Sequence, residues 1–357
     1  MFADSYRGRR VLVTGHTGFK GSWLALWLTE LGANVSGIAL APERGRESHW
    51  EALNLDCPSR IVDIRDAPAL REAVAEAAPE IVFHLAAQSL VRRSYADPAA
   101  TWDVNVAGTV NLFEACRAAR TVRAIVCVTS DKCYENREWI WGYRETDRLG
   151  GHDPYSASKA ATEIVAASYR RSFFEAEGIA LATARGGNVI GGGDWSEDRL
   201  IPDLARATIA GEPLVIRSPR ATRPWQHVLD CLSGYLDLGH RLLTDPEGFA
   251  EPWNYGPDRQ SNLTVEAVLS AMQRRWPDLL WQVADAPQPH EANLLCLDTS
   301  KACAAQGWRP VWDFETTIDM TAGWYAAWIG NGQPISRAQL AQYTRDAASV
   351  GVPWAAA

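Results

Sequence analysis

Short apolar runs alternate with longer stretches of helical periodicity through the first half of the chain. The apolar runs predict strands at residues 10–14, 34–40, 59–62, 81–85, 123–129 and 179–184. The longer stretches predict helices at residues 20–31, 67–77, about 98–119 and about 155–177. Because the strands are apolar along their whole length, they are expected to be buried on both faces by helices. The pattern predicts an α/β fold with a doubly wound, Rossmann-type parallel sheet.

Glycine and proline interrupt the chain more often after about residue 186. The helical stretches of this half cover residues 198–210, 227–243 and 264–275, with irregular segments between them. We therefore expect a first domain over residues 1–187, to which 226–245 returns. A smaller second lobe is expected to comprise residues 188–225 and 246–357.

Composition excludes several classes of protein. The 357-residue chain has a formal net charge of −8 and no basic run, which argues against a nucleic-acid partner. Its seven cysteines are an odd number with no C-x-x-C spacing, so we expect free thiols in a cytoplasmic protein. The apolar run at 11–13 ends too early for a signal peptide or membrane span, so no membrane partner is expected. Composition alone leaves the 16 tryptophans unexplained.

A glycine-rich turn follows the first predicted strand directly and precedes the first predicted helix. Without side chains at its glycines, such a turn closes tightly and brings backbone N–H groups and a helix N-terminus to a pyrophosphate. The turn predicts a dinucleotide site formed by Gly15, His16, Thr17, Gly18, Phe19, Lys20 and Gly21.

A second pattern with chemical meaning is Tyr155-Ser156-Ala157-Ser158-Lys159. Residues four apart lie on one face of a helix, so the Lys159 cation is expected beside the Tyr155 phenol. A nearby cation lowers the pKa of a phenol, which would make Tyr155 a base able to take a hydroxyl proton.

The G-x-x-G-x-x-G turn and the Y-x-x-x-K pattern together resemble the extended short-chain dehydrogenase/reductase (NAD-dependent epimerase/dehydratase) family over essentially the whole chain. The resemblance implies that the first domain binds NAD and that the second lobe binds a sugar nucleotide. It also implies cofactor contacts from Tyr155, Lys159, Asp63, Ile64, Leu85, Ala86, Ala87 and Gln88. The second strand lacks the acidic residue that commonly holds the adenosine ribose, and Arg44 and Arg46 follow it. NADP therefore stays open as the alternative cofactor.

The fifth predicted strand ends in Ser130-Asp131-Lys132. Epimerases of the family usually carry small hydroxyl residues here and no acid, whereas sugar-nucleotide 4,6-dehydratases usually carry Thr-Asp-Glu. The segment therefore resembles the dehydratases, and the Asp-Lys pair resembles the branch that acts on CDP-glucose. The implied reaction is C4 oxidation, elimination of water across C5–C6 and hydride return to C6, in deoxysugar and O-antigen biosynthesis. A dTDP-, UDP- or GDP-linked substrate, a 4-epimerase and a catalytically silent NAD-binding scaffold are the alternatives.

This chemistry needs a base for the O4 proton, a base at C5 and an acid at the C6 hydroxyl. Tyr155, assisted by Ser130, would take the O4 proton. Asp131, kept protonated in a dry cleft, suits the acid. Lys132, made neutral by burial and by nearby Lys159, suits the base. Which member of the Asp131–Lys132 pair carries each step stays open.

The resemblance also implies a site for the sugar nucleotide. The implied contacts are Gln88, Ser130, Asn188, Arg199, Arg217, Arg223 and His290. Arg223 is expected to clamp the diphosphate, because a planar guanidinium meets two phosphate oxygens at once. His16 and His84 have no carboxylate partner at ligand spacing, so no metal is expected. A homodimer or dimer of dimers is expected through helices 98–119 and 155–177.

Overall fold

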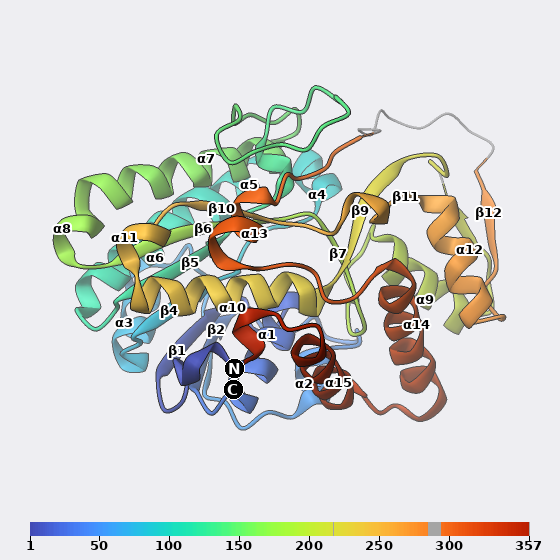
Figure 1. The fold of residues 1–357 in the computed structure, drawn as a ribbon, viewed down its shortest axis with the longest axis horizontal. Helices are drawn as coiled ribbons and strands as arrows, with labels where there is room; N and C mark the ends of the chain where they lie inside the picture. Colours follow the sequence, from blue (N-terminus) through green and yellow to red (C-terminus); the bar gives the residue numbers. More distant parts are fainter. Residues whose placement is uncertain (217, 285–293, 357) are drawn as a thin grey trace.

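The computed structural model describes residues 1–216, 218–284 and 294–356, so the predicted contacts Arg217 and His290 lie outside the described residues. Its main sheet has seven parallel strands in the order β10-β6-β5-β4-β1-β2-β3 (Figure 1). The strands are β1 (Arg10–Thr14), β2 (Asn34–Ala39), β3 (Ser59–Ile61), β4 (Ile81–His84), β5 (Ala124–Val128), β6 (Ala180–Gly186) and β10 (Pro252–Tyr255). This order, with its reversal between β1 and β4, confirms the Rossmann-type sheet.

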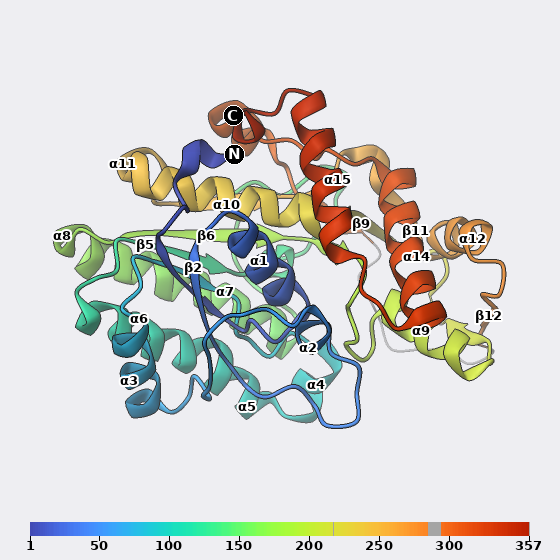
Figure 2. The same ribbon diagram turned by 90° about the horizontal axis from the view of Figure 1, so that it is seen from below.

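Helices cover both faces of the sheet (Figure 2). Val11 and Val13 of β1 pack into one core with α1 (Phe19–Glu30) and α10 (Val228–Thr244). Leu12, which points the other way, packs into a second core with helices of the opposite face. Those helices are α3 (Ala67–Ala77), α6 (Gly108–Ala119) and α7 (Pro154–Tyr169). Burial of both faces explains why β1, β4 and β5 are largely apolar, whereas the edge strand β3 is exposed and contains Ser59 and Arg60.

The two long predicted helices are each built from shorter pieces joined by a π-helical turn. The first comprises α5 (Pro98–Trp102), η2 (Asp103–Ala107) and α6. The second comprises α7, η4 (Arg170–Phe174) and α8 (Glu175–Glu177). Their outer bounds agree with the predicted ranges within one residue, whereas a π turn leaves no clear mark in the hydrophobic pattern.

The later half of the chain adds two small sheets and several helices beside the main sheet, mostly at the right of Figure 1. The small-sheet strands are β7 (Asn188–Ile190), β8 (Leu214–Ile216), β9 (Thr222–His227), β11 (Asn262–Thr264) and β12 (Trp281–Val283). The helices are α9 (Leu200–Ala210), α11 (Pro246–Phe249), α12 (Val265–Arg275), α13 (Ser300–Gln306), α14 (Phe314–Asn331) and α15 (Ser336–Ser349). The edge strand β10 comes from the range assigned to the second lobe. The division into two lobes stays a prediction.

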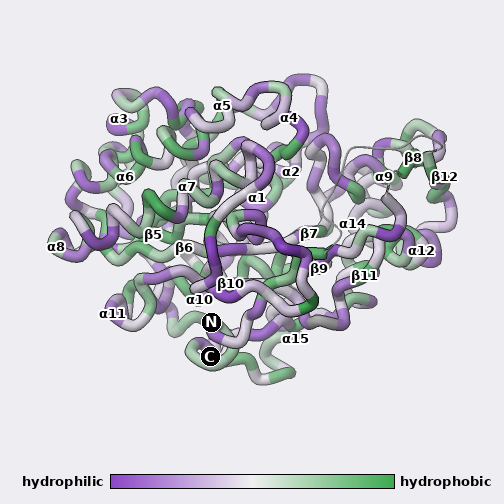
Figure 3. Tube along the Cα trace, turned by 90° about the horizontal axis from the view of Figure 1, so that it is seen from above, coloured by the Kyte–Doolittle hydropathy of each residue, from purple (hydrophilic) through white to green (hydrophobic). Residues whose placement is uncertain are grey.

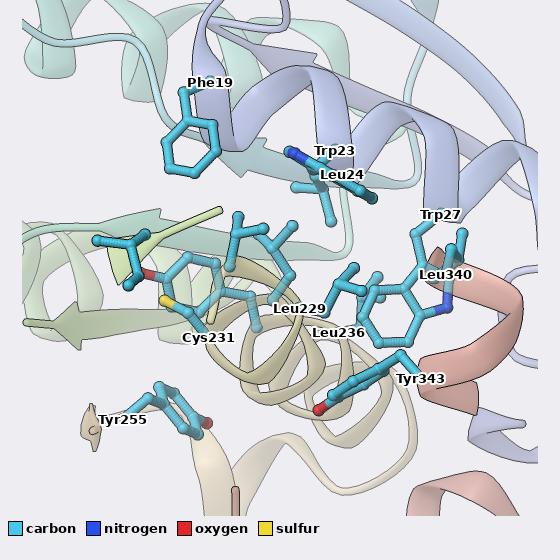
Figure 4. Close-up of a cluster of buried hydrophobic side chains, with 14 of the residues drawn as sticks. Phe19, Trp23, Leu24, Trp27, Leu229, Cys231, Leu236, Tyr255, Leu340 and Tyr343 are labelled. Atoms are coloured by element: carbon cyan, nitrogen blue, oxygen red, sulfur yellow. The ribbon is translucent and has the colours of Figure 1, made fainter. Parts of the chain in front are cut away.

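Aromatic side chains fill much of the core between α1, α10 and α15 (Figure 4). The Trp27 ring lies 5.6 Å from the rings of both Tyr343 and Trp354, and Phe2 stacks on Trp354 at 5.0 Å. These contacts bring the two ends of the chain together, as Figures 1 and 2 show. Large rings bury much apolar surface, so the tryptophans are explained in part by this core.

Hydropathy along the trace agrees with this packing. Figure 3 shows β5 among the hydrophobic stretches, whereas hydrophilic residues concentrate in peripheral helices and loops. In the described parts of the chain, no helix is both long and apolar enough to cross a lipid bilayer. The remaining short elements are α2 (His49–Leu53), α4 (Val91–Ala96), η1 (Phe2–Asp4), η3 (Asp131–Cys133), η5 (Arg259–Ser261) and η6 (Pro353–Ala355).

Candidate active site

The predicted site residues gather at the carboxyl ends of β1, β4 and β5, where the strand order reverses. In open α/β sheets, ligands bind in the crevice at this point. A cavity of about 270 Å³ opens beside the ends of β1 and β4. Its lining includes Thr17, Gly18 and Phe19 from the glycine-rich turn, together with Ala87 and Gln88 after β4. The cavity therefore joins the two loops that the sequence assigned to the cofactor.

The glycine-rich turn has the geometry of an anion cradle. Gly15 has a φ of +77°, and a Cβ there would lie 2.8 Å from the backbone nitrogen of Ala86. A Cβ on Gly21 would lie 2.1 Å from the carbonyl oxygen of Gly15. No described side chain caps α1 at Gly18, so N–H groups of its first turn remain for an anion. These features fit a dinucleotide.

The side chains of the turn point in different directions. Thr17 donates a hydrogen bond to the carbonyl oxygen of Leu40, which ties the turn to the end of β2. Phe19 is buried in the core of Figure 4. Lys20 reaches α10, where its Nζ lies 3.4 Å from the Tyr235 hydroxyl. The turn is therefore anchored by its side chains while its backbone faces the cavity.

Two buried histidines lie beside the turn. The His16 Nε2 is 2.7 Å from Ser59 Oγ, and burial lowers the pKa of His16 to about 4. His84 lies between Thr14 and Thr109, and burial lowers its pKa to about 3. Both rings are neutral at pH 7. Among described residues, no group of three or more His, Cys, Asp or Glu side chains could hold a metal ion.

The other predicted cofactor residues hold their loops in place. The Asp63 carboxylate accepts hydrogen bonds from Arg65 at 2.6 and 3.0 Å, which lowers the pKa of Asp63. Ile64 packs against Gly108, where a Cβ would lie 2.6 Å from it. After β4, the backbone nitrogens of Leu85 and Ala86 donate to Thr14. These contacts fix the two loops against β1 and α6.

Helix α7 begins one residue before Tyr155. The Asp153 side chain accepts hydrogen bonds from the Ser156 backbone nitrogen at 2.9 Å and from its hydroxyl at 2.6 Å, while Pro154 occupies the first turn. Lys159 lies one turn later, buried, and its Nζ donates to the Val128 carbonyl oxygen at 3.2 Å. Burial lowers the pKa of Lys159 to about 8. The cap thus sets where both functional side chains emerge.

The structure brings Tyr155 and Ser130 together, close enough for the Ser130 hydroxyl to act on the pKa of the phenol. Burial raises the pKa of Tyr155 to about 12, although Ser130 and the charge of Arg199 act in the opposite direction. The prediction that Lys159 lowers this pKa toward neutrality is therefore wrong in its net direction. The physical reason is that Tyr155 is only 7% exposed, and the desolvation of a phenolate outweighs the nearby positive charges.

Asp131 is a deeply buried acid of the site, at 3% exposure. Its Oδ1 accepts a hydrogen bond from Ser130 Oγ at 3.0 Å, and its Oδ2 has no described partner. Burial raises the pKa of Asp131, while Lys132, Lys20 and Arg223 oppose the shift through their charges. The raised pKa has the direction expected of a carboxyl that stays protonated. Lys132, by contrast, is half-buried.

Glu163 is a residue of this site that the sequence interpretation missed. It follows Lys159 by four residues on α7, and its carboxylate accepts hydrogen bonds from Thr129, from Thr183 at 2.7 Å and from Arg185 at 2.8 Å. Glu163 and Arg185 are both buried. The network ties α7 to the ends of β5 and β6. The continued spacing of four residues from Tyr155 and Lys159 was the available signal.

Arg199 and Asn188, which are predicted to contact the sugar nucleotide, lie on separate segments of the chain. Arg199 donates to Asp194 at 3.1 Å and to Ser89 at 3.2 Å. Asn188 on β7 lies opposite Trp225 on β9.

Arg223 and Gln88 are two further residues predicted to contact the sugar nucleotide. Arg223, also on β9, donates to the Thr222 carbonyl oxygen at 2.8 Å, and its charge reaches Asp131. Gln88 is held by Asn105, which accepts from its backbone nitrogen at 2.8 Å. Asn105 in turn donates to Ser158 at 2.8 Å, so the loop after β4 is tied to α7. The charged and polar side chains of Arg199, Asn188, Arg223 and Gln88 are therefore suited to an anionic ligand.

The chain is similar in sequence and in structure to known enzymes of sugar nucleotides. The model of the NAD dependent epimerase/dehydratase family matches residues 11–247. A CDP-glucose 4,6-dehydratase of Salmonella typhimurium is 50% identical over 331 residues, which cover 91% of this chain and 92% of that protein. A dTDP-glucose 4,6-dehydratase of Xanthomonas campestris is 28% identical over 335 residues, with coverages of 88% and 92%. A structure of Thermus thermophilus UDP-glucose 4-epimerase in complex with NAD is 27% identical, with a TM-score of 0.76 over 88% of this chain and 98% of that one.

Proposed function

The chain belongs to the NAD dependent epimerase/dehydratase family, and we propose that it is a hydro-lyase that converts CDP-glucose to CDP-4-keto-6-deoxyglucose and water. The observation that carries this proposal is the 50% identity to a CDP-glucose 4,6-dehydratase over 91% of the chain. Asp131 is buried beside Lys132, and its Oδ2 has no described hydrogen-bond partner. This supports a dehydratase rather than an epimerase, because elimination needs an acid and a base side by side.

The cofactor proposed for this reaction is NAD. The cradle at Gly15 and Gly21 would hold its pyrophosphate, and the loops around Asp63 and Gln88 would flank it. When bound, NAD supplies the acceptor for the C4 hydride and the donor that reduces C6. We further infer that Lys159, whose Nζ is fixed on Val128, orients the cofactor and the Tyr155 phenol together.

Tyr155, Lys132 and Asp131 each carry out one proton transfer of the proposed reaction. Tyr155, which lies beside Ser130, takes the O4 proton as C4 is oxidised. The resulting ketone acidifies the C5 hydrogen, which Lys132 removes. Asp131 donates its proton to the C6 hydroxyl, the C6–O bond breaks and water leaves. Burial suits Asp131 to this role because it favours the protonated carboxyl.

The sugar nucleotide is proposed to bind with its diphosphate near Arg223 and Asn188, and with its hexose between Tyr155 and Asp131. A guanidinium at Arg223 offers paired donors for phosphate oxygens. We place the enzyme in the cytoplasm, where nucleotide sugars are made, and assign its product to deoxysugar and O-antigen synthesis. Free thiols at all seven cysteines agree with that compartment.

A panel of nucleotide hexoses tests the substrate. We expect purified protein with NAD to convert CDP-glucose to a 4-keto product, detected by its absorbance in alkali. The dTDP-, UDP- and GDP-linked glucoses should react at least tenfold more slowly, as expected when a site lacks partners for polar groups of the wrong base, at about 1.4 kcal/mol per factor of ten. Product from another hexose but not from CDP-glucose would contradict the substrate assignment and leave the dehydratase chemistry intact.

We propose that the protein is a homodimer formed through α5, α6 and α7. Large apolar side chains are exposed on and beside these helices: Tyr95, Trp102, Ile164 and Phe173, at 60%, 40%, 61% and 37%. Small residues at Ala157 and Ala161 on the same helix α7 permit close approach of a second copy. Patches of exposed apolar groups on a folded surface mark association sites.

Light scattering should therefore give a mass of two or four times the 39.3 kDa chain. The variant Ile164→Glu should shift the protein toward the monomer, because it buries a charge in the proposed interface. Leu280→Glu, at an exposed position of the other half of the chain, is the matched control and should leave the mass unchanged. A monomeric mass for the unmodified protein would contradict the proposal.

A further inference from the structure

Lysine is rare in this chain, and three of its four lysines lie at the proposed active site. The 35 basic residues are 31 arginines and only four lysines, at positions 20, 132, 159 and 301. Lys132 and Lys159 have proposed chemical roles, and Lys301 lies apart from them, with its Nζ on the Pro252 carbonyl oxygen at 2.8 Å. Almost every other basic residue of the chain is arginine, so the lysine at position 20 indicates a need for an ammonium group there.

The Lys20 side chain occupies a small pocket built for it by distant parts of the chain. Its half-buried ammonium lies 3.4 Å from the Tyr235 hydroxyl and close to the Cys231 thiol, both on α10. Gly186, at the end of β6, leaves room for this arrangement. A Cβ on Gly186 would lie 2.8 Å from the Tyr235 hydroxyl and 3.5 Å from Lys20 Nζ. A compact ammonium suits this space better than a planar guanidinium.

The Lys20 pocket at Gly186 adjoins the backbone that packs on the buried acid. Gly187 follows Gly186, and a Cβ on it would lie 3.3 Å from Asp131 Oδ2, the oxygen that has no described partner. The Lys20 charge acts on both Asp131 and Lys159. The titratable and charged groups that face Asp131 are Lys132 and Cys133 on its own segment, Tyr155 on α7, Lys20 on α1 and Arg223 on β9.

We propose that Lys20 is a positioning residue for the elimination step: its ammonium stabilises the carboxylate that Asp131 becomes when it protonates the departing C6 hydroxyl. This inference rests on the proposed function. In this step, the electron pair of the C5–H bond forms the C5–C6 double bond, and the base takes the C5 proton. The Asp131 proton leaves as part of the water molecule. Lys20 keeps its own protons throughout. Asp131 regains a proton from solvent before the next turnover.

The variant Lys20→Met tests the proposal by its kinetic pattern. We expect kcat to fall about 10- to 100-fold, the range for one hydrogen bond to a charged group, while KM and the affinity for NAD change little. Removal of a cation raises the pKa of a carboxyl, so the alkaline limb of the pH profile should move to higher pH. Lys301→Met is the matched control, with unchanged kcat and pH profile.

A second variant separates the charge from the shape of the side chain. Lys20→Ala should lose the same activity and regain part of it as methylamine is added, because the free amine restores a cation to the emptied pocket. Thermal unfolding shows whether each variant is folded, and NAD titration shows whether it binds the cofactor.

Two results would overturn the inference: an unchanged kcat and pH profile in Lys20→Met, or a weakened affinity for NAD with no shift in the pH profile, which would place Lys20 on the pyrophosphate. The unmodified enzyme is assayed alongside. If it converts no nucleotide hexose, the proposed function fails. If it is active while Lys20→Met is indistinguishable from it, only the role of Lys20 fails.

Discussion

Replacing Tyr155 by phenylalanine is expected to lower turnover by about 10²- to 10⁴-fold, the usual contribution of a positioned acid–base group. The Tyr155 phenol on α7 lies beside Ser130, and we propose that it takes the O4 proton. Phenylalanine fills the same buried space, so the protein should fold and bind NAD as before. Both oxidation at C4 and formation of the 4-keto product should therefore be lost together.

The pKa of Tyr155 adds a pH dependence to this prediction. Burial raises this pKa to about 12, so the phenol is protonated at neutral pH and the base form becomes more populated as pH rises. Activity of the unmodified enzyme should rise with pH until another group titrates, and the residual activity of Tyr155→Phe should lack this rise. Tyr169→Phe, at the far end of α7 with its hydroxyl on Glu114, is the matched control. More than one tenth of normal turnover in Tyr155→Phe would contradict the assignment.

The sheet was predictable where a main strand is a compact apolar run between turn-forming residues, as in β1, β4 and β5. β1 was predicted to the residue, and the helices that cover the sheet have clear periodicity. The hydrophobic periodicity does not identify a helix whose buried residues are not confined to one face. α14 buries residues among aromatic neighbours on several faces, and α15 has few apolar residues, so neither shows a clean amphipathic period. β10 has only four residues and depends on the neighbouring β6 for its place.

The candidate site was predictable where its geometry is local. Tyr155 and Lys159 are one helical turn apart, so the sequence alone places them on one face. The direction of the Tyr155 pKa is not local, since it depends on how completely other segments bury the phenol. The pocket of Lys20 is also non-local, because its partner Tyr235 is 215 residues away along the chain. No periodicity within one segment carries that information.

Replacing Asp131 by asparagine is expected to separate oxidation from elimination. The amide keeps the shape of the carboxyl and the contact with Ser130, but it has no acidic proton for the departing C6 hydroxyl. We expect formation of the 4-keto-6-deoxy product to fall about 10²- to 10⁴-fold. Removal of hydride from C4 should continue, so the ultraviolet absorbance of reduced nicotinamide should accumulate with the substrate bound.

The pH dependence of folding gives an independent measurement on the same residue. The pKa of Asp131 is raised in the folded protein, so the folded state binds the proton more tightly than the unfolded state. The free energy of unfolding therefore falls as pH rises from the ordinary pKa of aspartate, about 3.9, through the raised value. Asp131→Asn removes that fall, and the variant should be at least as stable as the unmodified protein at neutral pH.

The partner variant Lys132→Ala distinguishes the two members of the pair. If Lys132 is the base at C5, the alanine variant also fails to exchange the C5 hydrogen for deuterium in heavy water, whereas Asp131→Asn still exchanges it. Exchange lost in Asp131→Asn and kept in Lys132→Ala would reverse the two roles. Product formed at the normal rate by either variant would remove that residue from the elimination altogether, because a buried acid beside a half-buried amine would then serve only the fold.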